Sequence, residues 1–315
     1  MKILVTGAAG MIGRKLVERL EGELTLHDVV ALPGANSVVS DLSAPGAAEA
    51  LIAGRPELIF HLAAVVSGEA EADFDKGYRV NLDGTRHLFE AIRRAGGGYR
   101  PRLVFASSIA VFGAPFPEAI GDEFLSAPLT SYGTQKAIGE LLLADYSRRG
   151  IFDGIGIRLP TVCVRPGKPN QAASGFFSGI IREPLNGQPA VLPVPESVRH
   201  WFASPRAAVG FLLHAAALPG ERLGARRSLT MPGVCASVGE QIAALRKVAG
   251  ERAAALIRHQ PDPVIMRIVG GWPQNFDARR ALSLGFRADA SFEEIIRIHI
   301  EDELQKSPPL PAARA

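Results

Sequence analysis

Short apolar runs alternate with helical patterns through the first half of the chain. The helical patterns occupy residues 11–20, 81–95 and 131–148. Strands that are apolar on both faces are typical of a parallel sheet covered by helices on each side. The alternation therefore predicts an α/β fold with a doubly wound parallel sheet and right-handed crossovers. The predicted strands are KILVT (2–6), ELTLHD (23–28), SVVS (37–40), LIFHLA (58–63), RLVFAS (102–107) and GIGIRL (154–159).

The pattern changes after about residue 165. Pro and Gly become frequent, as in REPLNGQPAVLPVPES, and helical patterns dominate at 204–218, 237–249 and 291–304. We expect a nucleotide-binding sheet domain at 1–165 and a smaller, mostly helical substrate lobe at 166–305, with the chain free to cross back into the sheet. The Pro/Ala-rich segment 306–315 is expected to be a loose tail.

Composition excludes several classes of protein. Of the 315 residues, 47% are hydrophobic and 21% charged, and the net charge is only +3, which indicates a globular protein without a nucleic-acid surface. Cys163 and Cys235 are too few for a disulfide framework or a zinc site, and they fit a reducing compartment. No apolar run reaches the roughly 18 residues that cross a membrane, and the apolar run in MKILVTG is too short for a signal peptide. We predict a cytoplasmic protein with no metal, membrane or nucleic-acid partner.

Three glycines lie where the first predicted strand is followed by the first predicted helix. Gly7, Gly10 and Gly13 lie in LVTGAAGMIG, where they permit a tight turn and close approach of the backbone. The free N–H groups and positive dipole end of the following helix suit a pyrophosphate. The stretch therefore predicts a Rossmann-type dinucleotide site, with Ala9, Met11 and Ile12 also touching the cofactor.

The end of the second strand predicts the cofactor type. Asp28 follows Gly7 by about 20 residues, where a carboxylate accepts hydrogen bonds from the adenine ribose. It would repel a 2′-phosphate, and VVALPG offers no cation to offset it, so NAD is favoured over NADP. A turn-capping role for Asp28 is the alternative. Asp41 and Leu42 are expected along the adenine, although Asp41 fits a turn or helix cap equally well.

A phenol and an amine are spaced for catalysis in SYGTQKAIGE. Tyr132 and Lys136 share one helix face, and the ammonium would favour the phenolate. Lowering a tyrosine pKa from about 10 to about 7 requires roughly 4 kcal/mol. A phenolate so formed could take a proton from an alcohol while hydride leaves the same carbon. The pair alone is weak, but Ser107 and Ser108 end a predicted strand that would reach the same crevice.

Together these segments resemble the extended short-chain dehydrogenase/reductase family. The likeness rests on TGAAGMIG, HLAA, VNLDGT, SSIAVFG and YGTQK, with Phe112 departing from the family's usual Tyr. It implies NAD-dependent oxidoreduction, usually by a homodimer, with Tyr132 as acid/base, Lys136 on the nicotinamide ribose and Ser108 holding the reacting oxygen. Strand-ending roles for Ser107 and Ser108, and a helix cap for Asn81, are the alternatives. The resemblance also implies contributions from Ser107, Asn81, Leu62, Ala63, Ala64 and Pro160.

The substrate segments depart from the nucleotide-sugar epimerases and dehydratases of that family. RLPTVCVRPGKPN and VRHWFASP lack the Asn, Tyr and Asp usual there. They resemble a narrower group, the D-erythronate dehydrogenases, which implies NAD⁺-dependent oxidation of a four-carbon sugar acid to its 2-keto form. Nucleotide-sugar epimerase or dehydratase stays the alternative, and a non-catalytic dinucleotide sensor is a third reading that the Ser/Tyr/Lys set disfavours.

A small hydroxy acid needs a cation for its carboxylate, best supplied by a bidentate arginine. The candidates are Arg165, Arg182 and Arg199, with His200 assisting, although each arginine taken singly also fits a structural ion pair. Ser67, in the loop after the fourth strand, could reach the substrate or the nicotinamide.

Overall fold

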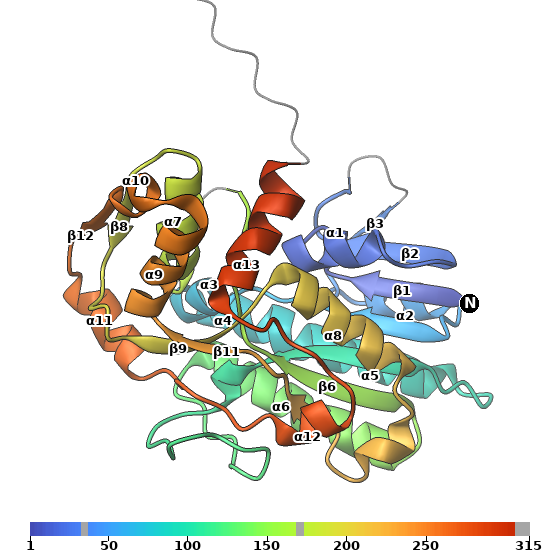
Figure 1. The fold of residues 1–315 in the computed structure, drawn as a ribbon. Coiled ribbons are helices and arrows are strands. Elements are labelled where there is room, and N and C mark those ends of the chain that lie inside the picture. The colour runs from blue at the N-terminus through green and yellow to red at the C-terminus, as the bar shows by residue number, and fades with distance from the viewer. Residues whose placement is uncertain (33–36, 168–172, 306–315) are drawn as a thin grey trace, which may run out of the picture.

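The computed structural model describes residues 1–32, 37–167 and 173–305. Seven parallel strands form its central sheet in the order β10–β6–β5–β4–β1–β2–β3 (Figure 1). The strands are β1 (Lys2–Thr6), β2 (Glu23–Asp28), β3 (Ser37–Val39), β4 (Leu58–His61), β5 (Arg102–Ser108), β6 (Asp153–Leu159) and β10 (Ser228–Thr230).

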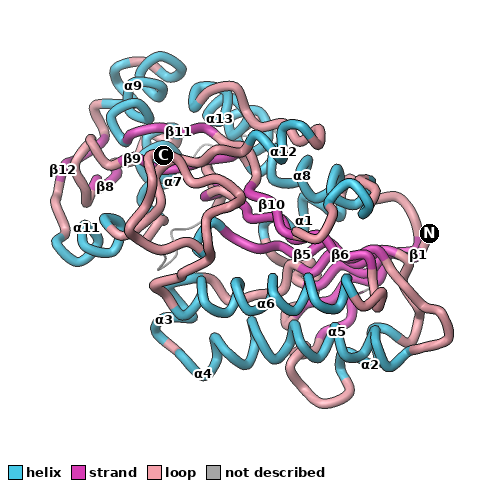
Figure 2. Tube along the Cα trace, turned by 90° about the horizontal axis from the view of Figure 1, so that it is seen from below, coloured by secondary structure: helices cyan, strands magenta, loops and turns pink. Residues whose placement is uncertain are grey.

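Both faces of the sheet are buried because successive side chains of each strand point to opposite sides. In β1, Ile3 and Val5 join one apolar core and Leu4 joins the other. Helices α1 (Met11–Val17) and α8 (Pro205–Ala217) cover the first face, and α2 (Ala47–Ile52), α5 (Gly84–Ala95) and α6 (Ser131–Arg148) cover the second (Figure 2). The predicted doubly wound Rossmann-type sheet is confirmed.

The smaller lobe has its own apolar core, in which Phe177, Phe202 and Ile295 are fully buried. A three-stranded sheet contains β7 (Thr161–Val162), β9 (Arg199–Ala203) and β11 (Val234–Ser237), and β8 (Ala190–Leu192) pairs with β12 (Ile257–His259). The lobe is mostly helical, as predicted. Its helices are α7 (Gly175–Leu185), α9 (Val238–Ala249), α10 (Glu251–Ala254), α11 (Pro263–Gly270) and α13 (Phe292–His299).

Several elements differ in detail from the sequence pattern. The predicted helix at 81–95 begins instead as a π-helix, η1 (Tyr78–Asp83), and becomes α-helical at Gly84. The chain returns to the large sheet at β10, which pairs with β6 and is too short to give a clear period-2 signal. The predicted tail at 306–315 lies outside the described residues.

Short elements make the remaining connections. They are α3 (Ser67–Ala72), α4 (Phe74–Gly77), α12 (Arg279–Ser283), the 3₁₀ helices η2 (Ile109–Val111) and η3 (Gly220–Leu223), and the π-helix η4 (Ile300–Leu304). Across residues 1–32, 37–167 and 173–305, no helix has both the length and the apolar character that a membrane span requires.

The strand order places a binding crevice beside β1. The chain builds outward from β1 through β2 and β3 on one side and from β4 through β5 and β6 on the other. At such a switch point the connections after neighbouring strands leave in opposite directions and open a crevice at their carboxyl ends. The loops after β1 and β4 meet there.

Candidate active site

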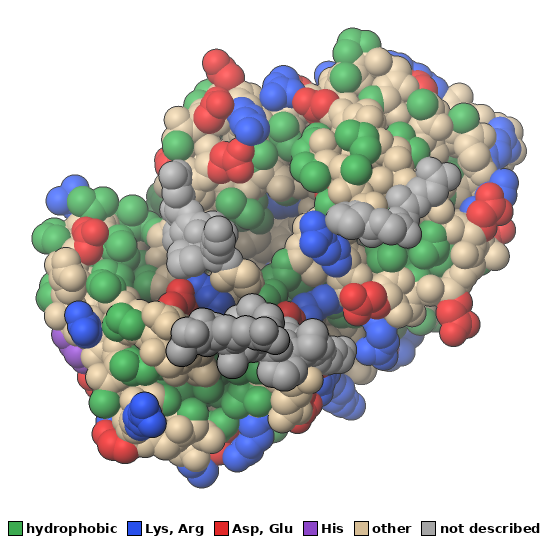
Figure 3. Space-filling model, turned by 90° about the horizontal axis from the view of Figure 1, so that it is seen from above, with side chains coloured by type: hydrophobic (Ala, Val, Ile, Leu, Met, Phe, Trp, Pro, Cys, Tyr) green, Lys and Arg blue, Asp and Glu red, His purple; other side chains and the backbone are tan. Residues whose placement is uncertain are grey.

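A cavity of about 520 Å³ lies at these carboxyl ends, between the sheet and the lobe. The surface is hollowed there, and Lys and Arg side chains border the hollow (Figure 3). Six parts of the chain line the cavity: the glycine loop, the loop after β4, the end of β5 with the start of α6, β7 with the start of α7, His200 of β9, and the segment 271–273. Cofactor and substrate candidates therefore share one cavity.

The glycine loop is packed too tightly for side chains. Gly7 has φ +76°, and a Cβ added to it would lie 2.6 Å from the backbone nitrogen of Ala63. A Cβ on Gly13 would lie 2.3 Å from the carbonyl oxygen of Gly7. Met11 and Ile12 line the cavity beside these glycines. The sequence pattern therefore corresponds to a bare backbone cradle at the start of α1.

Asp28 lies behind this loop, at the end of β2. Its carboxylate accepts hydrogen bonds from the backbone N–H groups of Ala9 at 2.9 Å and Val30 at 3.3 Å. Among the described residues no cation forms an ion pair with it. The carboxylate thus keeps acceptor capacity for a ribose hydroxyl while it fixes the loop.

The Asp41 carboxylate is bonded by nearby residues of the protein. Its carboxylate accepts from the Ser43 backbone N–H at 2.9 Å and from the Ser43 hydroxyl at 2.6 Å, and it pairs with Arg79. Leu42 beside it is 5% exposed, and neither residue lines the cavity. These contacts fit the turn role for Asp41 better than a role on the adenine.

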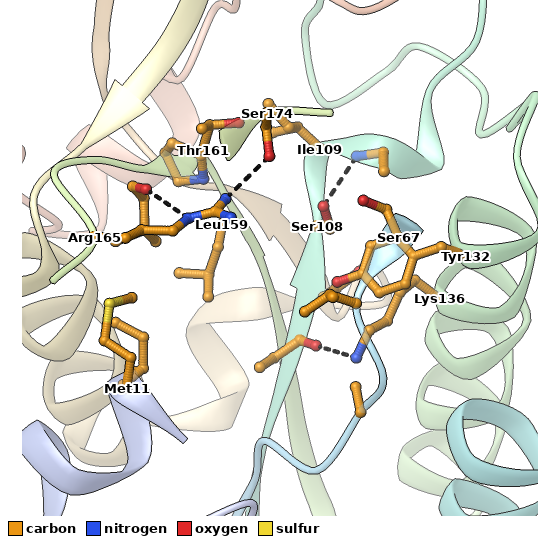
Figure 4. A pocket seen from close by; sticks show the side chains of 18 of the residues that line it. Met11, Ser67, Ser108, Ile109, Tyr132, Lys136, Leu159, Thr161, Arg165 and Ser174 are labelled. Atoms are coloured by element: carbon orange, nitrogen blue, oxygen red, sulfur yellow. Dashed lines mark hydrogen bonds between the residues drawn. The ribbon is translucent and has the colours of Figure 1, made fainter. Parts of the chain in front are cut away.

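Helix α6 places the phenol and the amine together. Thr130 caps the helix by accepting from the backbone N–H of Gly133 at 3.1 Å. The Lys136 ammonium donates to the carbonyl of Ala106 at 2.9 Å and lies 5.8 Å from the centre of the Tyr132 ring. Ser108, at the end of β5, lies close to the Tyr132 side chain in the cavity (Figure 4). The three side chains that sequence alone separates do gather in the cavity.

Burial dominates the electrostatics of this group. It raises the pKa of Tyr132, while the Ser108 hydrogen bond and the positive charge of Arg165 act in the opposite direction. Burial also lowers the pKa of Lys136 to about 8, against the nearby Glu140 carboxylate. The pKa of Tyr132 is thus raised because desolvation disfavours the phenolate, and the positive charge that opposes this is that of Arg165, where the sequence led us to expect Lys136.

Two other predicted catalytic residues, Ser107 and Asn81, form hydrogen bonds with other groups of the protein. The hydroxyl of Ser107 donates to Glu140 at 2.5 Å, and Glu140 is paired with Arg158 at 2.7 Å. The Asn81 amide donates to Gln135 at 2.8 Å and bonds both backbone groups of Val65. Asn81 therefore ties the loop after β4 to α6, one residue from Lys136, and its side chain does not line the cavity. Asn81 therefore joins two segments of the protein and does not cap a helix.

Arg165 faces this group across the cavity (Figure 4). Its guanidinium donates to the carbonyl of Val162 at 3.0 Å and to the hydroxyl of Ser174 at 3.4 Å. No described acidic side chain pairs with it, and burial lowers its pKa. A buried guanidinium with neutral partners has donors and charge available for an anion. Ser67 lines the cavity near Tyr132.

The other cationic candidates are committed elsewhere. Arg182 lines the cavity, but its guanidinium pairs with Glu183 at 2.6 Å and donates to the carbonyl of Arg165 at 2.7 Å. Arg199 lies outside the cavity lining and pairs with Glu240 at 3.1 Å. His200 lines the cavity, and both of its ring nitrogens have partners within the protein.

Sequence reasoning missed part of the lobe's contribution. Thr161, Trp272 and Pro273 line the cavity together with Arg165 and His200, and we call these five residues the lobe wall. Ser108, Tyr132 and Lys136 form the sheet wall. The aromatic residue in the Gly-Gly-Trp-Pro turn at 270–273 was a usable signal, because a large apolar side chain in a turn suits a binding site.

The remaining predicted residues are placed as follows. Leu62, Ala64 and Pro160 line the cavity. Ala63 instead packs against Gly7, and its backbone N–H donates to the Thr6 hydroxyl at 3.4 Å. Ala9 contributes its N–H to Asp28. The structure thus brings most of the predicted cofactor residues to the cavity or to the wall just behind it.

Known proteins resemble this chain closely. The family model of the NAD dependent epimerase/dehydratase family matches residues 3–215. The chain belongs to this family. D-erythronate dehydrogenase of Cupriavidus necator is 49% identical over 96% of this chain and 98% of its own length. D-erythronate dehydrogenase of Haemophilus influenzae is 39% identical over 96% of this chain and its whole length.

A solved structure is closer still in sequence. The nucleoside-diphosphate-sugar epimerase from Agrobacterium tumefaciens is 65% identical, has a TM-score of 0.93, and covers 98% of this chain and 95% of its own. The chain is therefore an NAD-dependent oxidoreductase of the extended short-chain type, and NAD is its cofactor. The residues present fit that cofactor, since Gly7 and Gly13 leave a cradle that any Cβ would fill.

Proposed function

We propose that the protein oxidises a small sugar acid with NAD⁺, converting D-erythronate to 2-dehydro-D-erythronate. The observation that carries the proposal is Arg165, which faces Ser108 and Tyr132 across the cavity and has no acidic partner among the described residues. A carboxylate on Arg165 would direct the neighbouring C2 hydroxyl toward the sheet wall. The two relatives named for D-erythronate oxidation support this choice of acid.

In this proposal the substrate hydroxyl binds between Ser108 and Tyr132. Ser108 fixes the oxygen, and Tyr132 takes its proton as the carbonyl forms. NAD⁺ when bound supplies the hydride acceptor and a further positive charge. Lys136 holds a ribose hydroxyl and keeps positive charge near the phenol, because a pKa of about 8 leaves most of it protonated at pH 7.

Because the pKa of Tyr132 is raised, the site must stabilise the phenolate before Tyr132 can act as a base. Water is excluded around the phenol, so each nearby positive charge acts in a medium of low dielectric constant and has a large effect. Arg165 already acts in that direction. A bound carboxylate would neutralise part of this charge, so Lys136 and the cofactor are the cations that favour the phenolate during turnover.

The test is a panel of four- to six-carbon sugar acids assayed with NAD⁺ and with NADP⁺. We expect D-erythronate and NAD⁺ to give the highest kcat/KM, measured as formation of reduced cofactor. Absence of turnover with every acid in the panel would refute the substrate class. A higher kcat/KM with NADP⁺ would refute the role of Asp28.

Nucleoside-diphosphate-sugar epimerisation is a second candidate, supported by the name of the 65% identical solved protein. With the same Ser, Tyr and Lys, a sugar would be oxidised transiently by the bound NAD⁺ and then reduced again by the NADH so formed. An epimerase would convert a nucleotide sugar without net formation of NADH. We expect incubation with uridine and thymidine diphosphate sugars to leave them unchanged, and formation of an epimer would favour this candidate.

A further inference from the structure

Thr161 belongs to the lobe wall and has no role in the mechanism above. Its side chain lines the cavity at the start of β7, next to the carbonyl of Val162 that orients Arg165 (Figure 4). The Thr161 hydroxyl lies 2.7 Å from Nε2 of His200, and Nδ1 of the same ring lies 3.0 Å from the carbonyl of Pro273. Three residues distant in sequence thus form one hydrogen-bonded chain.

The donors and acceptors in this series of hydrogen bonds are fixed by the Pro273 carbonyl, which can only accept a hydrogen bond. Nδ1 of His200 must therefore carry the proton, and in a neutral ring Nε2 is then an acceptor. Burial lowers the pKa of His200 to about 4, so the ring is neutral at pH 7. Parallel stacking on Phe177, at 5.3 Å between ring centres, holds its orientation.

The Thr161 hydroxyl consequently donates its proton to His200. Its oxygen retains lone pairs for a further hydrogen bond, and the Arg165 guanidinium, which lines the same cavity, is purely a donor. A ligand that satisfies both must offer an anion to Arg165 and a hydroxyl proton to Thr161. Another carboxylate oxygen on Thr161 would find no proton.

We propose that Thr161 is a specificity-determining residue that accepts a hydrogen bond from a substrate hydroxyl beyond the reacting carbon. The inference rests on the proposed oxidation of a sugar acid and deepens it, because it predicts that a polyhydroxy acid is preferred to a simple 2-hydroxy acid. His200 and Pro273 act as positioning residues that keep the Thr161 proton turned away from the substrate.

The test combines a change in the substrate with a change in the protein. D-erythronate is compared with the 2-hydroxybutyrate enantiomer of the same configuration at C2, which lacks both distal hydroxyls. The wild type is expected to favour D-erythronate. Thr161→Val should lower kcat/KM for D-erythronate roughly 10- to 100-fold and leave that for 2-hydroxybutyrate unchanged. Thr161→Ser, which retains the hydroxyl, should keep the wild-type preference.

Each other outcome has a defined meaning. Equal losses on both acids, or no loss on either, would overturn the specificity role of Thr161 while the activity on D-erythronate stands. A wild type inactive on all sugar acids would instead refute the proposed function. NAD⁺ affinity and melting temperature report on folding, and Thr161→Ala, which places no methyl group at the Oγ1 position facing His200, repeats the test if the valine variant does not fold.

Discussion

The two walls of the cavity are built in different ways. The sheet wall takes Ser108 from the end of β5 and Tyr132 and Lys136 from one turn of α6, all within 29 residues of sequence. The lobe wall joins Thr161 and Arg165 to His200 and to the turn at 271–273, so its members span more than 100 residues. The first is compact in sequence, and the second exists only in the folded chain.

The walls also differ in charge. The sheet wall contains the groups that would exchange protons in the proposed reaction, and burial favours the neutral forms of Tyr132 and Lys136 by raising the pKa of the first and lowering that of the second. The lobe wall contains a fixed cation, Arg165, and a neutral histidine. The comparison suggests that one wall performs the reaction and the other selects the molecule that undergoes it, and the following experiments test this division.

Removing the phenolic hydroxyl should have the largest effect. We expect Tyr132→Phe to lower kcat roughly 10²- to 10⁴-fold, since the ring stays but no group can take the substrate proton. The variant should still bind NAD⁺, and a fluorescence titration measures that binding. An active Phe variant would mean that another group is the base, and it would move the chemistry away from the sheet wall.

Removing the lobe wall's cation should affect binding more than chemistry. Arg165→Gln should raise KM for D-erythronate and lower kcat/KM roughly 10- to 100-fold, because a charge-assisted hydrogen bond to a carboxylate is lost. The matched control is Arg199→Gln, whose guanidinium pairs with Glu240 outside the cavity. Equal effects of the two substitutions would show that Arg165 does not bind the carboxylate.

The same contrast explains how far the sequence predicts the site. The glycine loop, Ser108, Tyr132 and Lys136 could be found because each follows from a local rule: a bare turn, a strand end, or the i, i+4 spacing of a helix. The parallel sheet followed from strands with no polar face. These features need only the neighbouring residues along the chain, so tertiary packing does not change them.

The lobe wall could be found only in part in this way. Arg165, Arg182 and Arg199 look alike in sequence, and only the folded chain shows that Glu183 and Glu240 occupy the last two. Thr161 and Pro273 gain their importance from His200, which bonds both. Long-range partners decide which polar residue is free, and no periodicity encodes them.

A smaller effect is expected at the adenosine end, away from both walls. Asp28→Ser should raise the ratio of kcat/KM with NADP⁺ to that with NAD⁺ about tenfold, because a 2′-phosphate would no longer meet a like charge. Both constants are measured with saturating D-erythronate. Because the Asp28 carboxylate also accepts from the Ala9 N–H, some loss of NAD⁺ affinity should accompany the change. An unchanged ratio would leave Asp28 with a loop-fixing role alone.

The smallest expected effect concerns stability in mild acid. Burial lowers the pKa of His200 to about 4, so the unfolded chain takes up a proton near pH 6.5 that the folded protein excludes. His200 therefore contributes stability that is present above pH 6.5 and is lost as the pH falls toward 4. Between pH 7 and pH 5.5 this loss amounts to about 1 kcal/mol of unfolding free energy.

Urea unfolding of the wild type and of His200→Gln at the two pH values measures this contribution. The variant should be less stable at pH 7, because Thr161 and Pro273 lose their partner, but its stability should fall less on acidification, by about 1 kcal/mol. His61 supplies an internal comparison, because burial lowers its pKa to about 3 in the sheet domain and it is intact in both proteins. An identical pH dependence in the two proteins would mean that the folded protein takes up a proton on His200 as readily as the unfolded chain does, and the lowered pKa of His200 would then be wrong.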